Sequence, residues 1–124
     1  MKASIRHQHS GEEFYTPEQC HITELSNSTD DPEVSIARAR VAPGVTTRWH
    51  RLAATSERYY ILSGQGLVEI GELTQHKVSA GDIVLIPPMC RQRIANVGED
   101  DLVFLAICTP PFANDAYEDI EEEQ

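Results

Sequence analysis

Two short stretches of this 124-residue chain contain side chains that can carry out acid–base chemistry. The first stretch, residues 44–64, holds His50 and, seven positions later, Glu57. The second stretch, residues 81–96, holds Gln92 among apolar neighbours. A carboxylate beside an imidazole favours the charged imidazolium. A His50–Glu57 pair held in one hollow could therefore act as a general acid or base, or bind a small anion.

Motifs of several other catalytic classes are missing from the sequence. It has no Gly-rich phosphate loop, no nucleophile elbow, no Cys-x-x-Cys pair and no His-Glu-x-x-His sequence. The three cysteines, Cys20, Cys90 and Cys108, are odd in number and have no paired spacing. The N-terminus has no apolar segment of a signal peptide, so we expect reduced thiols and a cytoplasmic location.

The elements that must position these side chains are short β-strands. Turn-forming residues such as Pro43-Gly44, Ala80-Gly81-Asp82 and Pro87-Pro88 separate them, and no apolar period of 3.6 residues is sustained before Pro110. Many evenly spaced strands are typical of a β-sandwich or barrel. The strand-like runs are residues 20–25, 34–42, 57–62, 67–70, 76–79, 83–86, 90–95 and 102–109.

We expect a single barrel domain over residues 1–112 and an acidic tail over residues 113–124. Residues 83–86 and 102–107 are apolar at both parities, which predicts strands buried on both faces. The tail from Asp115 is expected to form a turn of helix and then to lie in solvent.

The alternation of side chains along a strand predicts a cavity. If Glu57 points inward, Tyr59 does too, and if Gln92 points inward, so do Cys90 and Ile94. Tyr59 is either a proton-transfer group or a packed tyrosine with a satisfied hydroxyl. A few polar groups in an apolar wall are typical of small-molecule sites. The predicted lining is His50, Leu52, Glu57, Tyr59, Cys90, Gln92 and Ile94.

The charge of the chain argues against two classes of partner. Twenty acidic residues face ten basic ones, for a net charge of −10, so a nucleic acid would meet no surplus of positive charge. The longest apolar run, residues 102–108, is far shorter than a membrane span. We expect Arg38 and Arg40 on the outer face, where they would pair with acidic residues of the body or of a second subunit. The alternative is that one of them binds a carboxylate group of the substrate.

The first stretch resembles the first motif of the cupin superfamily, G(X)5HXH(X)3–4E(X)6G. Gly44, His50, Glu57 and Gly64 fall at its spacing, and Leu52 stands where the motif has its second His. The resemblance implies an all-β, double-stranded β-helix (jelly-roll) barrel of the small single-domain kind.

The second stretch resembles the second cupin motif, G(X)5PXG(X)2H(X)3N. Gly81, Pro87 and Asn96 match it, whereas Met89 replaces a Gly and Gln92 replaces the His. Together the two matches span residues 44–96. Because cupins include enzymes, ligand-binding domains and storage proteins, the resemblance implies the fold more strongly than the function.

The resemblance also implies a site for one divalent metal ion (Fe, Mn, Ni or Zn). Position by position, the ligands would be His50 and Glu57, with Gln92 as a weaker neutral donor. Leu52 supplies no donor, so the expected affinity is well below that of a complete motif. The alternative is a repurposed site that holds no metal.

Three functions remain open from the sequence. One is binding of a small polar metabolite with metal-assisted conversion, of the dioxygenase, decarboxylase or isomerase type. Another is a metal-free ligand-binding or accessory module. The third is metal-free acid–base catalysis by His50, Glu57 and Tyr59. Small cupins of this kind commonly dimerise, so the resemblance also implies a homodimer.

Overall fold

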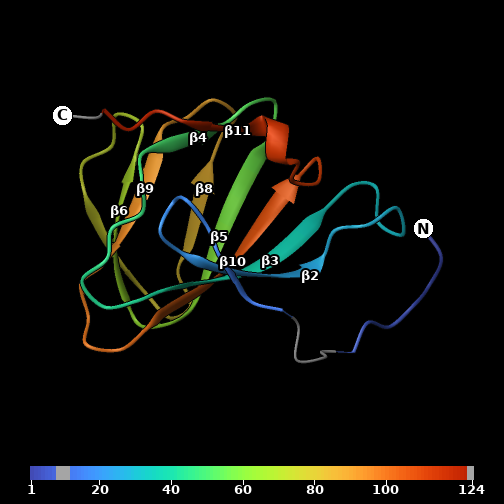
Figure 1. Cartoon of the computed structure of the whole chain (residues 1–124), viewed down its shortest axis with the longest axis horizontal. Helices are drawn as coiled ribbons and strands as arrows, with labels where there is room; N and C mark the ends of the chain where they lie inside the picture. Colours follow the sequence, from blue (N-terminus) through green and yellow to red (C-terminus); the bar gives the residue numbers. More distant parts are fainter. Residues whose placement is uncertain (8–11, 123–124) are drawn as a thin grey trace.

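The computed structural model describes residues 1–7 and 12–122 and is almost entirely β-structure (Figure 1). A single 3-10 turn, Asn114–Ala116, precedes the last strand. The described part contains no helix long and apolar enough to cross a membrane. The strands are β1 (Phe14–Tyr15), β2 (His21–Ser26), β3 (Ser35–Val41), β4 (His50–Leu52), β5 (Ser56–Ser63), β6 (Gln65–Ile70), β7 (His76–Ser79), β8 (Ile83–Ile86), β9 (Gln92–Asn96), β10 (Leu102–Thr109) and β11 (Tyr117–Asp119).

Two antiparallel sheets form the barrel. One has the strand order β1-β2-β3-β10-β5-β8 and the other the order β11-β4-β9-β6-β7. Strands that are neighbours in a sheet are often far apart in sequence, as in the pairing of β10 with both β3 and β5. This is the double-stranded β-helix (jelly-roll) architecture, and the expected all-β fold class is confirmed.

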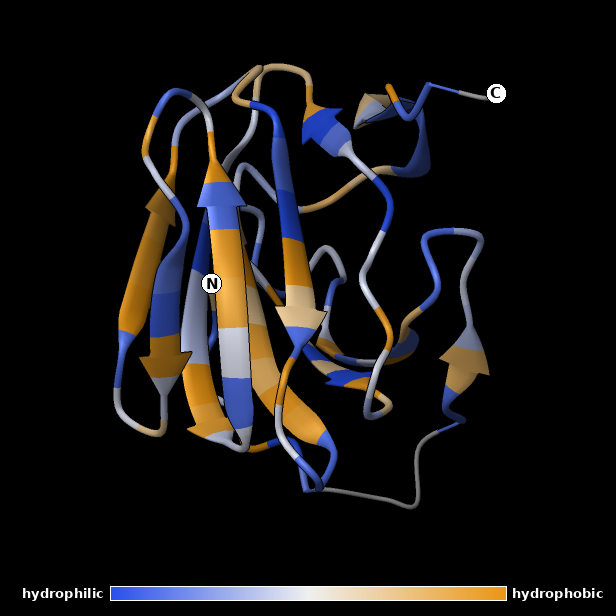
Figure 2. Cartoon of the chain, turned by 90° about the vertical axis from the view of Figure 1, so that its left-hand side faces the viewer, coloured by the Kyte–Doolittle hydropathy of each residue, from blue (hydrophilic) through white to orange (hydrophobic). Residues whose placement is uncertain are grey.

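The strands predicted from the sequence match the structure closely where they are long. Residues 76–79, 83–86 and 102–109 form strands with the predicted bounds. The strands β1, β4 and β11 were not expected, because two or three residues are too few to show a period. Hydrophilic and hydrophobic residues alternate along several strands of the barrel (Figure 2).

The acidic tail departs from its expected place in solvent. After the 3-10 turn, β11 pairs with β4, so that Tyr117 lies opposite Leu52 and Asp119 opposite His50. Arg51 and Arg48 on the barrel form ion pairs with the carboxylates of Glu118 and Asp119. The sequence-based expectation considered only the acidic residues of the tail and overlooked Tyr117. The Tyr117 ring stacks on that of His50.

The expected burial of residues 83–86 on both faces is wrong for this chain alone. Val84 and Ile86 belong to the core, whereas Ile83 and Leu85 are 64% and 70% exposed. The physical reason is that these two side chains point away from the barrel interior, where no other part of the described chain covers them. By contrast, β10 lies inside the sheet, with one face buried and the other mostly half-buried.

Several arginines lie on the outside of the barrel, and Arg40 was expected there. Arg40 forms ion pairs with Glu13 and Asp101. Arg91 and Arg93 place their guanidinium groups 4.4 and 4.3 Å from the centre of the Trp49 ring, one cation–π contact each.

Candidate functional site

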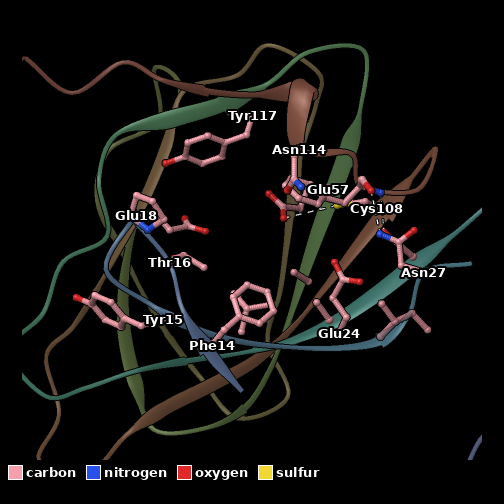
Figure 3. Close-up of a pocket in the computed structure, with 17 residues that line it drawn as sticks. Phe14, Tyr15, Thr16, Glu18, Glu24, Asn27, Glu57, Cys108, Asn114 and Tyr117 are labelled. Carbon is pink, nitrogen blue, oxygen red and sulfur yellow. Dashed lines mark hydrogen bonds between the residues drawn. The ribbon is translucent and has the colours of Figure 1, made fainter. Parts of the chain in front are cut away.

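A cavity of about 350 Å³ opens at one end of the barrel (Figure 3). Its walls come from β1, the following loop, β2 and β3 on one side, and from residues 112–117 on the other. An adjoining cavity of about 40 Å³ reaches into the barrel interior and shares Glu18, Glu57 and Tyr117 with the first. His50, Leu52 and Tyr59 line this inner part.

Glu57 stands at the junction of the two cavities. It lies on β5 and is only 8% exposed. Its Oε2 accepts a hydrogen bond from the Cys108 thiol at 3.7 Å, while its Oε1 has no hydrogen-bond partner. Burial raises the pKa of Glu57 to about 7, although His50 nearby acts in the opposite direction. The carboxyl group can therefore both hold and release a proton near neutral pH.

His50 is oriented by a backbone carbonyl of the preceding segment and by Glu18 and Tyr117, which come from near the two ends of the chain. Its Nδ1 donates to the Arg48 carbonyl at 2.7 Å, which leaves Nε2 as the nitrogen that faces the cavity. The Nε2 atom lies 3.5 Å from Glu18 Oε2, and the ring stacks on Tyr117 with 5.2 Å between centres. Both His50 and Glu57 line the inner cavity, but the carboxylate nearest to the imidazole is that of Glu18.

Tyr59 and Gln92 form a buried pair across the barrel. The Tyr59 hydroxyl donates to Gln92 Oε1 at 2.5 Å. Burial raises the pKa of Tyr59 well above its usual range, so the phenol keeps its proton. Gln92 Nε2 has no hydrogen-bond partner. Glu57 thus brings an unpaired acceptor to a residue that lines both cavities, whereas Gln92 is buried beside it and lines neither.

Three residues of the predicted lining border neither cavity, and one of them is the buried Gln92. Cys90 precedes β9 in a turn in which its N–H donates to the Pro87 carbonyl, so the alternation counted back from Gln92 does not reach it. Its sulfur lies against Gly71, which directly follows the neighbouring strand β6. Ile94 points inward but is packed in the core and touches neither cavity.

Sequence reasoning missed two residues that complete the site. Glu18 comes from the loop between β1 and β2, which is held to the barrel where the Arg48 N–H donates to the Glu18 carbonyl. Tyr117 comes from β11. No motif marks Glu18, whereas an aromatic residue inside an acidic tail was a signal that could have pointed to Tyr117.

Comparison with known proteins settles the family. The family model "Cupin domain" matches residues 37–108, more than half of the chain and both motif stretches. The chain is a cupin. This cupin is 34% identical over 87 residues to "Uncharacterized protein MJ1618" of Methanocaldococcus jannaschii, a match that covers 70% of this chain and 69% of that one.

One further relative and one solved structure of the same fold are enzymes by name. Oxalate decarboxylase OxdC of Bacillus subtilis is 27% identical over 108 residues; the match covers 84% of this cupin but only 27% of that protein. The solved structure of Pac13, a nucleoside dehydratase from Streptomyces, superposes with a TM-score of 0.79 at 18% identity. That superposition covers 99% of this chain and 95% of Pac13, and at such identity it shows the shared fold.

The side chains of this cupin do not fit the metal site that the motif implies. Gln92 Oε1, the expected oxygen donor, already accepts the Tyr59 hydroxyl, and the free end of its amide is a donor group. Leu52 is buried in the wall of the inner cavity at the position of the motif's second His. Among the described residues, no three His, Cys, Asp or Glu side chains are grouped to hold a metal ion.

Proposed function

We propose that this cupin is a metal-independent enzyme that moves a proton on a small molecule bound in the cavity, with Glu57 as the acid–base group. One observation carries the proposal: Glu57 Oε1 is buried at the cavity wall without a partner, on a carboxyl group whose pKa is raised to about 7. A carboxylate in that state is a stronger base than an exposed one and is still partly ionised at neutral pH.

The neighbouring groups support this role. Glu57 takes a proton from a C–H or O–H bond of the ligand and returns it to another atom, so the step needs no oxidant or reductant. The Cys108 thiol, whose pKa burial raises to about 12, stays protonated and holds Oε2 in place. His50 Nε2, at the inner cavity, is the polar nitrogen available to stabilise charge on the ligand.

Deuterium exchange tests the proposal even before a substrate has been identified. The protein is incubated with a set of small polar metabolites in D₂O, and proton NMR follows loss of signal at exchangeable carbon positions. We expect Glu57→Gln to slow any exchange by a factor of about 100 or more, with His50→Ala also impaired. Exchange that persists in both folded variants would place catalysis elsewhere. Ligand binding without exchange in the wild type would favour the binding-module alternative.

The metal alternative leads to a separate prediction. Leu52 and Gln92 occupy two of the three positions where the motifs have His, and Leu52 lines the inner cavity beside His50. We expect Leu52→His with Gln92→His to bind Ni²⁺ on the order of 100-fold more tightly than the wild type, because imidazole nitrogens then join His50 and Glu57. Isothermal titration measures the affinities. Tight, stoichiometric binding by the wild type would contradict the metal-independent mechanism.

We also infer that the protein forms a homodimer through the outer face of β5 and β8. The exposed Tyr60 lies opposite Ile83, and Leu85 lies opposite Arg58. The second copy is the favoured occupant because β8 is apolar on both faces, as a fully buried strand is, while one chain covers only one of them. A two-fold pairing brings the same apolar patch together from each chain.

A single charge on this face is expected to break the dimer. Leu85→Glu should raise the dissociation constant by more than about 10-fold, since the new carboxylate is desolvated in the interface. Analytical ultracentrifugation measures it. Val97→Glu is the matched control, because Val97 is 53% exposed, lies outside β5 and β8 and does not adjoin Leu85. A wild type that sediments as a monomer at high concentration would exclude the interface.

A further inference from the structure

The charged groups around the large cavity share one sign. Its charged lining residues are Glu18, Glu24 and Glu57, and among the described residues no lysine or arginine lines it. Figure 3 shows these three side chains around the same hollow, from the loop after β1, from β2 and from β5. Glu24 is exposed, Glu18 is largely buried and Glu57 is 8% exposed. The three carboxyl groups therefore run from the opening of the cavity to its buried end.

The buried Glu57 distinguishes this cavity from an acidic patch on the surface. Glu57 lines the cavity and its Oε1 has no hydrogen-bond partner, so the site offers an unused acceptor rather than an acidic surface alone. Glu18 Oε2 lies 3.5 Å from His50 Nε2, and the same imidazole lies near Glu57. A carboxylate or phosphate ligand would face these groups without a permanent cation to balance it.

Aromatic rings form much of the remaining wall. Phe14 and Tyr15 of β1 stand at the open side, and Phe112 and Tyr117 stand on the opposite segment. The faces of aromatic rings carry negative potential and attract cations, above all those of alkylated ammonium groups that shed water easily. Aromatic rings and carboxylates together favour a cation over a neutral sugar or an anion.

From this arrangement we propose that the ligand of the large cavity is an organic cation, a small molecule with a substituted ammonium group. The ammonium group lies among the rings and Glu24 near the opening, and the rest of the molecule points toward Glu57. The inference rests on the proposed function only in that both place the ligand beside Glu57; the charge preference is separate from the chemistry.

The test compares two molecules of nearly the same shape. Choline and 3,3-dimethyl-1-butanol differ in a quaternary nitrogen against a quaternary carbon, so their affinities separate charge from size. We expect choline to bind at least about 10-fold more tightly by NMR titration at low salt, and to lose part of this advantage in 0.5 M NaCl. Equal affinities, tighter binding of the alcohol or of acetate, or no saturable choline binding at millimolar concentration would each overturn the proposal.

Variants locate the effect in the cavity. Glu24→Gln should weaken choline about 3-fold and leave the alcohol unchanged, while Glu72→Gln, the same charge change on an exposed residue outside the cavity, should alter neither. Phe14→Leu keeps an apolar side chain but removes the ring, and should likewise weaken choline alone. Choline affinity unchanged in both cavity variants would overturn the assignment. Loss of exchange activity in Glu57→Gln concerns the proposed proton transfer, and choline preference can hold or fail independently of it.

Discussion

Replacing Glu57 by Gln is expected to raise the free energy of unfolding by about 3 kcal/mol at pH 8.5 and to leave it nearly unchanged at pH 4. The folded-state pKa of Glu57 is about 7, above its ordinary value of 4.5. Between these values the folded protein holds a proton that the unfolded chain releases, so the wild type loses stability as pH rises. The glutamine is neutral at every pH and avoids that loss.

Urea denaturation of both proteins between pH 4 and pH 8.5 measures the difference. The Glu72→Gln variant is the control, because Glu72 is exposed and its removal should give a stability difference that stays nearly flat with pH. A Glu57→Gln curve that runs parallel to the wild-type curve would show that Glu57 ionises at its ordinary pKa. It would also remove the basis for its role as the acid–base group.

Gly64→Ala is expected to be more destabilising than Gly81→Ala by about 2 kcal/mol, although both glycines end or begin a motif stretch and have nearly the same backbone angle. Their φ angles are +91° and +93°. A Cβ at position 64 would stand 2.6 Å from the Asp101 carbonyl oxygen and 2.8 Å from Leu102 Cα, whereas a Cβ at position 81 would meet open space. Both variants carry the left-handed strain, about 1–2 kcal/mol, and only the first adds a backbone clash.

Urea denaturation at pH 7 gives both losses, and the wild type supplies the reference. The comparison isolates the clash because the strain of the positive φ is common to the two variants. Equal losses would mean that the β5–β6 turn can shift away from the start of β10 at little cost. A larger loss in Gly81→Ala would contradict the packing of that turn altogether.

Local sequence was enough to place most of the barrel and part of the site. Period-two alternation and turn residues predicted the long strands, and they brought His50, Leu52, Glu57, Tyr59 and Gln92 to the interior. These residues lie on strands or at motif positions whose direction follows from neighbours a few residues away. The error at Cys90 has the same origin, since alternation counted along a strand fails once the chain turns.

The tertiary structure alone decided what surrounds Glu57. Glu18 and Tyr117 reach the cavity from near the two ends of the chain, through strands of two or three residues that carry no pattern of their own. It also decided that Gln92 is bound to Tyr59 and that Ile83 and Leu85 lie on an uncovered face. Such contacts join residues dozens of positions apart, and their energies depend on distances that only the closed barrel sets.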